Sequence, residues 1–158
     1  MNYHWNGYVQ KQWRCTIARM WGDTVAAMFD EVVKLGIQTI RCGIGIMHEP
    51  GEMEIWTAKP DGNGKVDLII GQIDMMLHPL LEGAFNGWRN KQELYTYDLL
   101  GDDLIAYFTA INNYPGYPIK YDIASLPSKI FHSEFHFPEG TLFVFSLEKL
   151  STEALKIF

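Results

Sequence analysis

Three polar side chains able to bind metal or to transfer protons alternate in the segment KIFHSEFHF (129–137): His132, Glu134 and His136. In a β-strand such residues share one face, with about 6.5 to 7 Å between neighbours. Two imidazoles and a carboxylate are ligands that zinc and iron accept. The alternative is that they simply form the polar face of the strand. Phenylalanines hold three of the remaining positions: Phe131, Phe135 and Phe137. Since no partner that would orient the imidazoles is evident, we expect the polar face and no metal.

Aromatic residues make up 14% of the chain and offer a second kind of binding chemistry. Tyrosine hydroxyls and indole N–H groups orient a planar small molecule while the rings stack on it. We predict a pocket lined by Trp56, Trp88, Tyr95, Tyr97, Phe131, Phe135 and Phe143. Among them Tyr95, Tyr97 and Trp56 are preferred, because they are amphipathic residues of strands whose other face is already apolar. The alternative is that these rings fill the core.

Other reactive side chains have structural explanations. Cys42 lies among isoleucines, which is typical of an inert buried thiol. Asp102 and Asp103 are expected to cap a helix and to favour its dipole. His78 precedes a proline at a predicted helix start, so we expect it to act in helix initiation. The segment DGNG (61–64) lacks the later acids of a calcium loop and is predicted to be a turn.

The composition indicates one globular domain, with 158 residues of which 47% are hydrophobic and 20% charged. A net charge of -6 without any basic run argues against nucleic-acid binding. No apolar run reaches the ~18 residues of a membrane span, so we expect no membrane insertion. The N-terminus has no signal peptide, and the two cysteines indicate no disulfide framework. We therefore expect a cytoplasmic protein.

Hydrophobic periodicity predicts the elements that position these residues. One helix is expected over residues 16–35. Three more are expected to begin at Pro79, Asp102 and Ser151. Strands are expected at 39–46, 52–58, 66–71, 93–99, 129–137 and 141–147, with loops at 59–66 and 112–127. Gly36 is expected to end the first helix in the left-handed conformation. The predicted fold is α+β, with one antiparallel sheet of five or six strands and helices on both faces.

The chain is expected to have three parts. Residues 1–15 form an unassigned N-terminal extension, and residues 16–150 form the domain. Residues 151–158 begin an outgoing helix, because the sequence ends within an apolar pattern without a cap. The apolar positions of that helix are expected to contact a second copy of the chain: Leu150, Ala154, Leu155 and Phe158.

Four segments carry a resemblance to a known family: FDEVVKLGIQTIRCGIGIM (29–47), EMEIWTA (52–58), HPLLEGAFNGWRNKQELYTYDLLGDDL (78–104) and FVFSLEKLSTEALKIF (143–158). They are similar to a GAF-like region found ahead of bacterial sensor histidine kinases and adenylate cyclases. The resemblance implies an antiparallel sheet between helices, and a C-terminal helix that continues into a signalling coil. It also implies a homodimer that pairs the terminal helices.

The resemblance does not identify a ligand. The asparagine, lysine, phenylalanine and aspartate signature of cyclic-nucleotide binders is missing, and no late cysteine is present to hold a bilin. We therefore expect no cofactor, and a small-molecule ligand of unknown identity. The predicted function is a non-catalytic sensing and dimerisation module that regulates a kinase or cyclase. The alternatives are a small enzyme that uses the strand from His132 to His136 on an apolar substrate, and a dimerisation module without a ligand.

Overall fold

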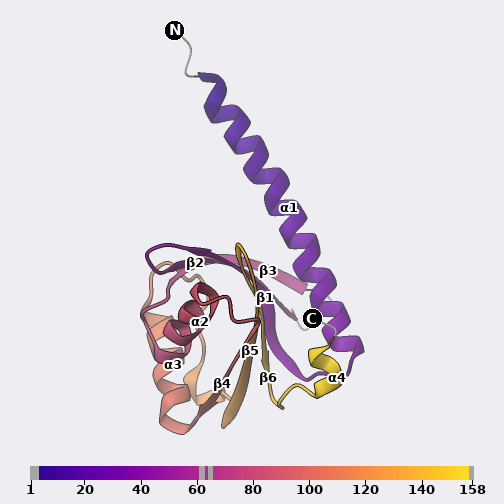
Figure 1. Ribbon diagram of the computed structural model, residues 1–158, viewed down its shortest axis with the longest axis vertical. Helices are drawn as coiled ribbons and strands as arrows, with labels where there is room; N and C mark the ends of the chain where they lie inside the picture. The colour runs from indigo at the N-terminus through magenta and orange to yellow at the C-terminus, as the bar shows by residue number, and fades with distance from the viewer. Residues whose placement is uncertain (1–3, 61–62, 64–65, 157–158) are drawn as a thin grey trace.

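The computed structural model describes residues 4–60, 63 and 66–156 of the chain (Figure 1). In chain order the elements are α1 (His4–Lys34), β1 (Thr39–His48), β2 (Glu52–Pro60), β3 (Val66–Asp74), α2 (Pro79–Arg89), β4 (Leu94–Leu100), α3 (Gly101–Asn113), the 3₁₀ helix η1 (Ile123–Ser125), β5 (Lys129–Phe137), β6 (Gly140–Ser146) and α4 (Thr152–Leu155). All the predicted strands are present. The DGNG turn lies outside the described residues except for Asn63.

The six strands form one open antiparallel sheet in the order β3-β2-β1-β6-β5-β4. The α+β class and the single sheet are therefore confirmed, and the sheet has the larger of the two predicted strand numbers. The central strands β1 and β6 come from distant parts of the sequence. They approach so closely at Gly140 that a Cβ atom there would lie 1.9 Å from the carbonyl oxygen of Gly45. Only glycine fits this contact.

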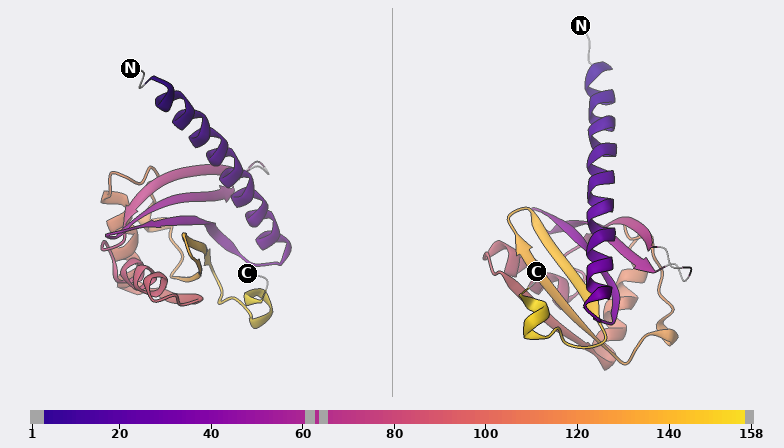
Figure 2. Two further views of the ribbon diagram at one scale, coloured as in Figure 1. Left: turned by 45° about the horizontal axis from the view of Figure 1, so that its top comes forward. Right: turned by 90° about the vertical axis from the view of Figure 1, so that its right-hand side faces the viewer.

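Helix α1 packs on one face of the sheet, against β1, β2 and β3. It begins at His4, well before the predicted residue 16, and its N-terminal part extends beyond the sheet (Figures 1 and 2). Gly36 follows it with a φ of 73°, as predicted. Within the predicted range 16–35, the apolar side chain of Met20 is 58% exposed and that of Leu35 is also exposed. The buried positions repeat every three or four residues from the half-buried Trp21: Val25, Phe29 and Val32.

Helices α2 and α3 cover the opposite face, where they pack on β4 and β5 (Figure 2). The predicted role of His78 is confirmed, because its Nδ1 accepts a hydrogen bond from the Leu80 backbone N–H and caps α2. The prediction that Asp102 caps α3 is wrong. That helix begins at Gly101, so Leu100 occupies the cap position, and its side chain accepts no hydrogen bond. Asp102 and Asp103 lie in the first turn, where acids still favour the dipole.

Helix α4 is short and lies near the C-terminal end of α1 (Figure 1). Ser151 begins it as predicted, with its hydroxyl accepting from the Ala154 backbone N–H. Ala154 is buried and Leu155 is half-buried. Phe158 lies outside the described residues, so the expected outgoing helix stays a prediction. Within the described part of the chain, no helix combines the length and the apolar character needed to cross a membrane.

The sheet separates two hydrophobic cores. The core under α1 contains Val25, Phe29, Cys42, Ile44, Trp56, Ala58 and Val144. The core under α2 and α3 is larger and contains most of the buried aromatic side chains. The site described next lies on the side of this second core.

Candidate functional site

The polar face of β5 is turned into the protein. His132 and Glu134 are 3% and 1% exposed, and the His136 side chain is also buried. A polar strand face usually lies toward solvent, but here α2 and α3 cover it. The opposite face of β5 lies beyond the reach of α1, which packs on β1 to β3. Phe131 and Phe135 on that face are therefore only half-buried.

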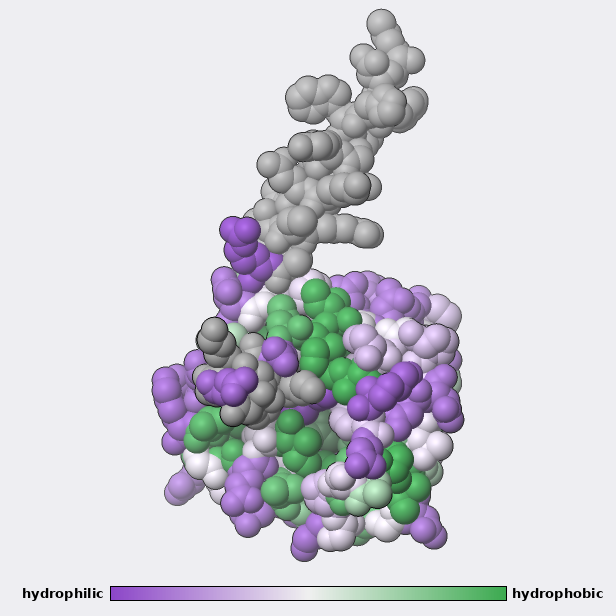
Figure 3. All heavy atoms as spheres, turned by 180° about the vertical axis from the view of Figure 1, so that it is seen from behind, coloured by the Kyte–Doolittle hydropathy of each residue, from purple (hydrophilic) through white to green (hydrophobic). Residues whose placement is uncertain are grey.

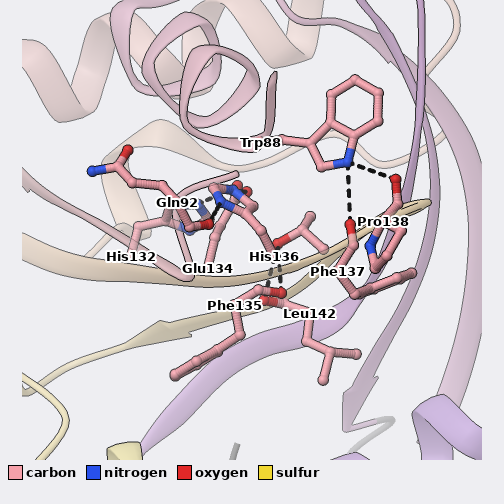
Figure 4. A network of polar contacts seen from close by, with 10 residues as sticks. Trp88, Gln92, His132, Glu134, Phe135, His136, Phe137, Pro138 and Leu142 are labelled. Carbon is pink, nitrogen blue, oxygen red and sulfur yellow. Dashed lines mark hydrogen bonds and ion pairs between the residues drawn. The ribbon is translucent and has the colours of Figure 1, made fainter. Parts of the chain in front are cut away.

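Glu134 lies between two histidines of its own strand (Figure 4). Its Oε1 is 2.6 Å from His132 Nε2, and its Oε2 is 3.4 Å from His136 Nε2. Burial alone would raise the pKa of Glu134, but the two imidazoles outweigh it and lower the pKa to about 2. The carboxylate is therefore ionised in an interior where a lone charge would be costly.

His136 contacts a backbone carbonyl with one ring nitrogen and lies near Glu134 with the other. Its Nδ1 is 2.8 Å from the backbone carbonyl oxygen of Gln92, which can only accept, so Nδ1 carries a proton (Figure 4). Nε2 then faces the ionised carboxylate of Glu134. The two atoms are 3.4 Å apart, and Nε2 has no hydrogen-bond partner among the described residues.

The three side chains meet at the Glu134 carboxylate. Each imidazole contacts a different oxygen of the same carboxylate, so their nitrogens do not converge on a common point. Within the described residues, no group of three or more histidine, cysteine, aspartate or glutamate side chains is placed to hold a metal ion.

Arg41 on β1 shares this face of the sheet. It is paired with Phe145 of β6, which is paired with His132 of β5. Arg41 is 6% exposed, and its guanidinium donates from Nη1 to the hydroxyl of Tyr117. Its central carbon lies 5.5 Å from the ring centre of Tyr117 and 4.9 Å from that of Tyr121. Such distances allow cation–π attraction.

The Arg41 charge has no counter-ion. No carboxylate of the described residues lies within ion-pair distance of it, and its Nε has no hydrogen-bond partner. His132 Nδ1 and Glu134 Oε2 are likewise buried without a hydrogen-bond partner. Buried polar atoms left in this state cost on the order of 1 to 3 kcal/mol each, more when charged.

These three side chains line one internal cavity of about 30 Å³. The other lining residues are mostly apolar or aromatic: Ile40, Met53, Ile55, Ile73, Leu81, Tyr107, Phe108, Ile111, Tyr117, Tyr121, Phe143 and Phe145. The volume suffices for about two water molecules. A larger occupant requires the surrounding side chains to move.

A second polar network adjoins this core. Since His78 Nδ1 accepts from the backbone, its Nε2 carries the proton and donates to Asp103 over 3.1 Å. Tyr97 donates to the other oxygen of Asp103 over 2.9 Å. Burial, reinforced by Asp103, raises the pKa of Tyr97. This network ties α2, α3 and β4 together beside the cavity.

The seven aromatic residues predicted to line a pocket do not meet at one place. Phe143 lines the cavity, and Tyr95 and Tyr97 pack on the same core. Trp56 lies on the opposite face of the sheet, under α1. Phe131 and Phe135 also point to that opposite face.

Trp88 belongs to a separate groove at the surface, of about 520 Å³. Its indole N–H lies 3.2 Å from the carbonyl oxygens of both Phe137 and Pro138 (Figure 4). The groove is also lined by His136.

Sequence reasoning did not select Arg41, Tyr117 or Tyr121. Arg41 alternates with the isoleucines of β1. The available signal was the pair of glycines that follow it, Gly43 and Gly45, which mark a strand approached closely on the side of Arg41.

No protein-family model, curated protein or solved structure matches this chain.

Proposed function

We propose that this protein is a non-catalytic sensory module that binds a small molecule between the sheet and helices α2 and α3. The observation that carries the proposal is that Arg41, His132 and Glu134 line one largely apolar cavity and that each has a buried polar atom without a hydrogen-bond partner. Ligand sites typically combine a mostly apolar lining with a few convergent polar groups. A ligand that pairs those atoms offsets their desolvation cost, which gives affinity and orientation together.

The proposed output is regulation of a kinase or cyclase. The similarity of the sequence to GAF-like regions ahead of such enzymes supports this part. So does α1, a 31-residue helix of which a large part leaves the domain, as a helix that transmits a signal would. In this mechanism the ligand changes the packing of terminal helices by favouring one of two arrangements.

Dimerisation is the second part of the proposed function. Exposed apolar side chains lie on α1 and on the edge strand β3: Met20, Leu68 and Ile70. Figure 3 shows apolar surface next to the point where α1 leaves the domain. Scattered apolar residues are ordinary at surfaces. A dimer that pairs the terminal helices would bring this region close to its two-fold axis.

A small enzyme is the second candidate, favoured by the short contact between His132 and Glu134 in the cavity wall. A carboxylate hydrogen-bonded to an imidazole is a common acid–base pair. Turnover separates the candidates. A sensor converts no substrate, whereas an enzyme turns a substrate over and loses that turnover when His132 and His136 are both replaced by glutamine.

The sensory proposal is tested by screening small organic molecules for an increase in melting temperature. A ligand stabilises the native state in proportion to the logarithm of its concentration relative to its Kd. Ile111→Val changes the cavity wall, and Ile44→Val is the matched control in the other core. Each is expected to cost about 1 kcal/mol of stability.

Only Ile111→Val is expected to change the affinity for molecules found in the screen. Equal effects of the two variants would place binding elsewhere. A screen in which no molecule raises the melting temperature would contradict the sensory proposal and favour a ligand-free dimerisation module.

A further inference from the structure

Among the described residues that line the cavity, Arg41 carries a charge and has no ion-pair partner. The carboxylate of Glu134 is ionised, but it lies within ion-pair distance of His136 and not of Arg41. His132 adds a hydrogen bond to the same carboxylate. Arg41 stays charged under all ordinary conditions. One buried positive charge is therefore left without a counter-ion among the described residues.

The residues around Arg41 fix the position of its guanidinium. Tyr117 and Tyr121, whose rings flank it, belong to the connection between α3 and η1. Asn112 fixes this connection by accepting from the Tyr121 backbone N–H over 2.7 Å and donating to its carbonyl over 2.8 Å. The carbonyl of Gly116 accepts from the Gln72 backbone N–H of β3. The guanidinium thus lies against two tyrosine rings of a segment that is itself fixed, while its Nε–H lacks an acceptor.

We propose, building on the sensory function above, that the ligand is a small organic monocarboxylate whose carboxylate pairs with Arg41. A carboxylate supplies the missing countercharge and accepts from Nε–H, and charge-assisted hydrogen bonds of this kind are about twice as strong as neutral ones. The apolar part of the acid lies against the lining residues Ile55, Ile73 and Phe143.

The same charges select against other anions. A ligand with two negative charges would leave one of them unmatched and would be repelled by Glu134 across the cavity. A phosphate monoester carries about two charges at neutral pH. A cation would be repelled by Arg41. The cavity of about 30 Å³ has room for about two water molecules, so even an acid of a few carbon atoms requires the lining side chains to move, and larger acids are disfavoured.

The test compares sodium propionate with its neutral analogue propionamide, at constant ionic strength, by calorimetric titration and by the shift in melting temperature. The two molecules have nearly the same shape, so the comparison isolates the charge. We expect propionate to bind the whole chain about tenfold more tightly or better, which corresponds to one good charged hydrogen bond. Propylammonium is expected not to bind.

Variants locate the effect at Arg41. Arg41→Gln is expected to remove the preference for the acid, so that propionate binds no better than propionamide. Arg41→Lys keeps the charge without the planar donor set, so it is expected to retain part of the preference. Arg89→Gln is the control, since Arg89 is an exposed residue of the surface groove. It is expected to leave both affinities unchanged.

The outcomes separate this inference from the proposed function. If propionamide binds as tightly as propionate, the carboxylate inference is overturned while the sensory function stands. If neither binds, and uncharged apolar probes such as cyclopentane also fail to raise the melting temperature, both are overturned. If Arg41→Gln does not fold, Arg41→Lys and the acid–amide comparison on the unaltered chain still decide the matter.

Discussion

The two faces of the sheet bury different kinds of side chain. Under α1 the core consists of aliphatic and aromatic side chains with one buried thiol, Cys42. Burial raises the pKa of that thiol to about 12, as expected for an inert cysteine. Under α2 and α3, the same sheet buries Arg41, His132, Glu134 and several tyrosines.

This difference suggests different roles: the α1 face serves stability, and the other face also serves ligand binding. Apolar residues of similar volume are often at least as stabilising as buried ion pairs, so charges are not needed to hold such a core together. Their concentration on one face, around one cavity, is what a binding site requires. The α1 face is therefore expected to respond to mutation through stability alone, and the other face through both stability and ligand affinity.

The largest expected effect follows from Glu134→Ala. It leaves His132 and His136 buried without the carboxylate that both contact. Removing one partner of a buried pair costs about 3 to 5 kcal/mol. Urea unfolding followed by tryptophan fluorescence measures this change.

Glu54→Ala is the matched control, because Glu54 is a half-buried residue on β2 that accepts a hydrogen bond from Trp56. We expect that control to cost about 1 kcal/mol. Equal costs for the two variants would show that the buried cluster contributes no more than an ordinary surface hydrogen bond.

Acid is expected to weaken the same cluster. The pKa of Glu134 is lowered from 4.5 to about 2, so the unfolded chain binds its proton more readily than the folded one. The stability that this group contributes is present above pH 4.5 and is lost as the pH falls toward 2. The loss is on the order of 2 to 3 kcal/mol.

Urea unfolding at a series of pH values measures this dependence, and Glu134→Gln provides the comparison. The variant is expected to be less stable at neutral pH and to lose less stability between pH 4.5 and 2. Parallel pH profiles for the two proteins would assign the acid sensitivity to other carboxylates.

Local periodicity was enough to predict most of the fold. Strands β1, β2, β5 and β6 follow from alternation, and α2 follows from Pro79 preceded by a capping residue. Helix α1 was predicted too short, because residues 4–15 lack the apolar spacing that marks a packed helix. Only the portion that contacts the sheet carries that spacing.

The site was harder to predict, because it depends on which face each helix covers. Alternation correctly placed His132, Glu134 and His136 on one side of β5, but it contains no information on whether that side is buried. The register between paired strands also depends on residues far apart in the sequence. Pairing across β1, β6 and β5 brings Arg41 into line with His132, and it sends Trp56 to the other face. None of these contacts joins residues close in sequence.

The smallest expected effect is the sharpest test of the comparison between the two faces. Val25 is fully buried under α1 and lies in the core that lacks charged side chains. Val25→Ala removes two methyl groups and is expected to cost about 2 kcal/mol, including the cavity left behind. If the α1 face acts through stability alone, propionate should raise the melting temperature of this variant by as much as that of the unaltered chain. A smaller increase would show that α1 and the ligand site are coupled through the sheet. That coupling is the one a signalling helix requires, so this result would break the division between the faces and strengthen the proposed relay.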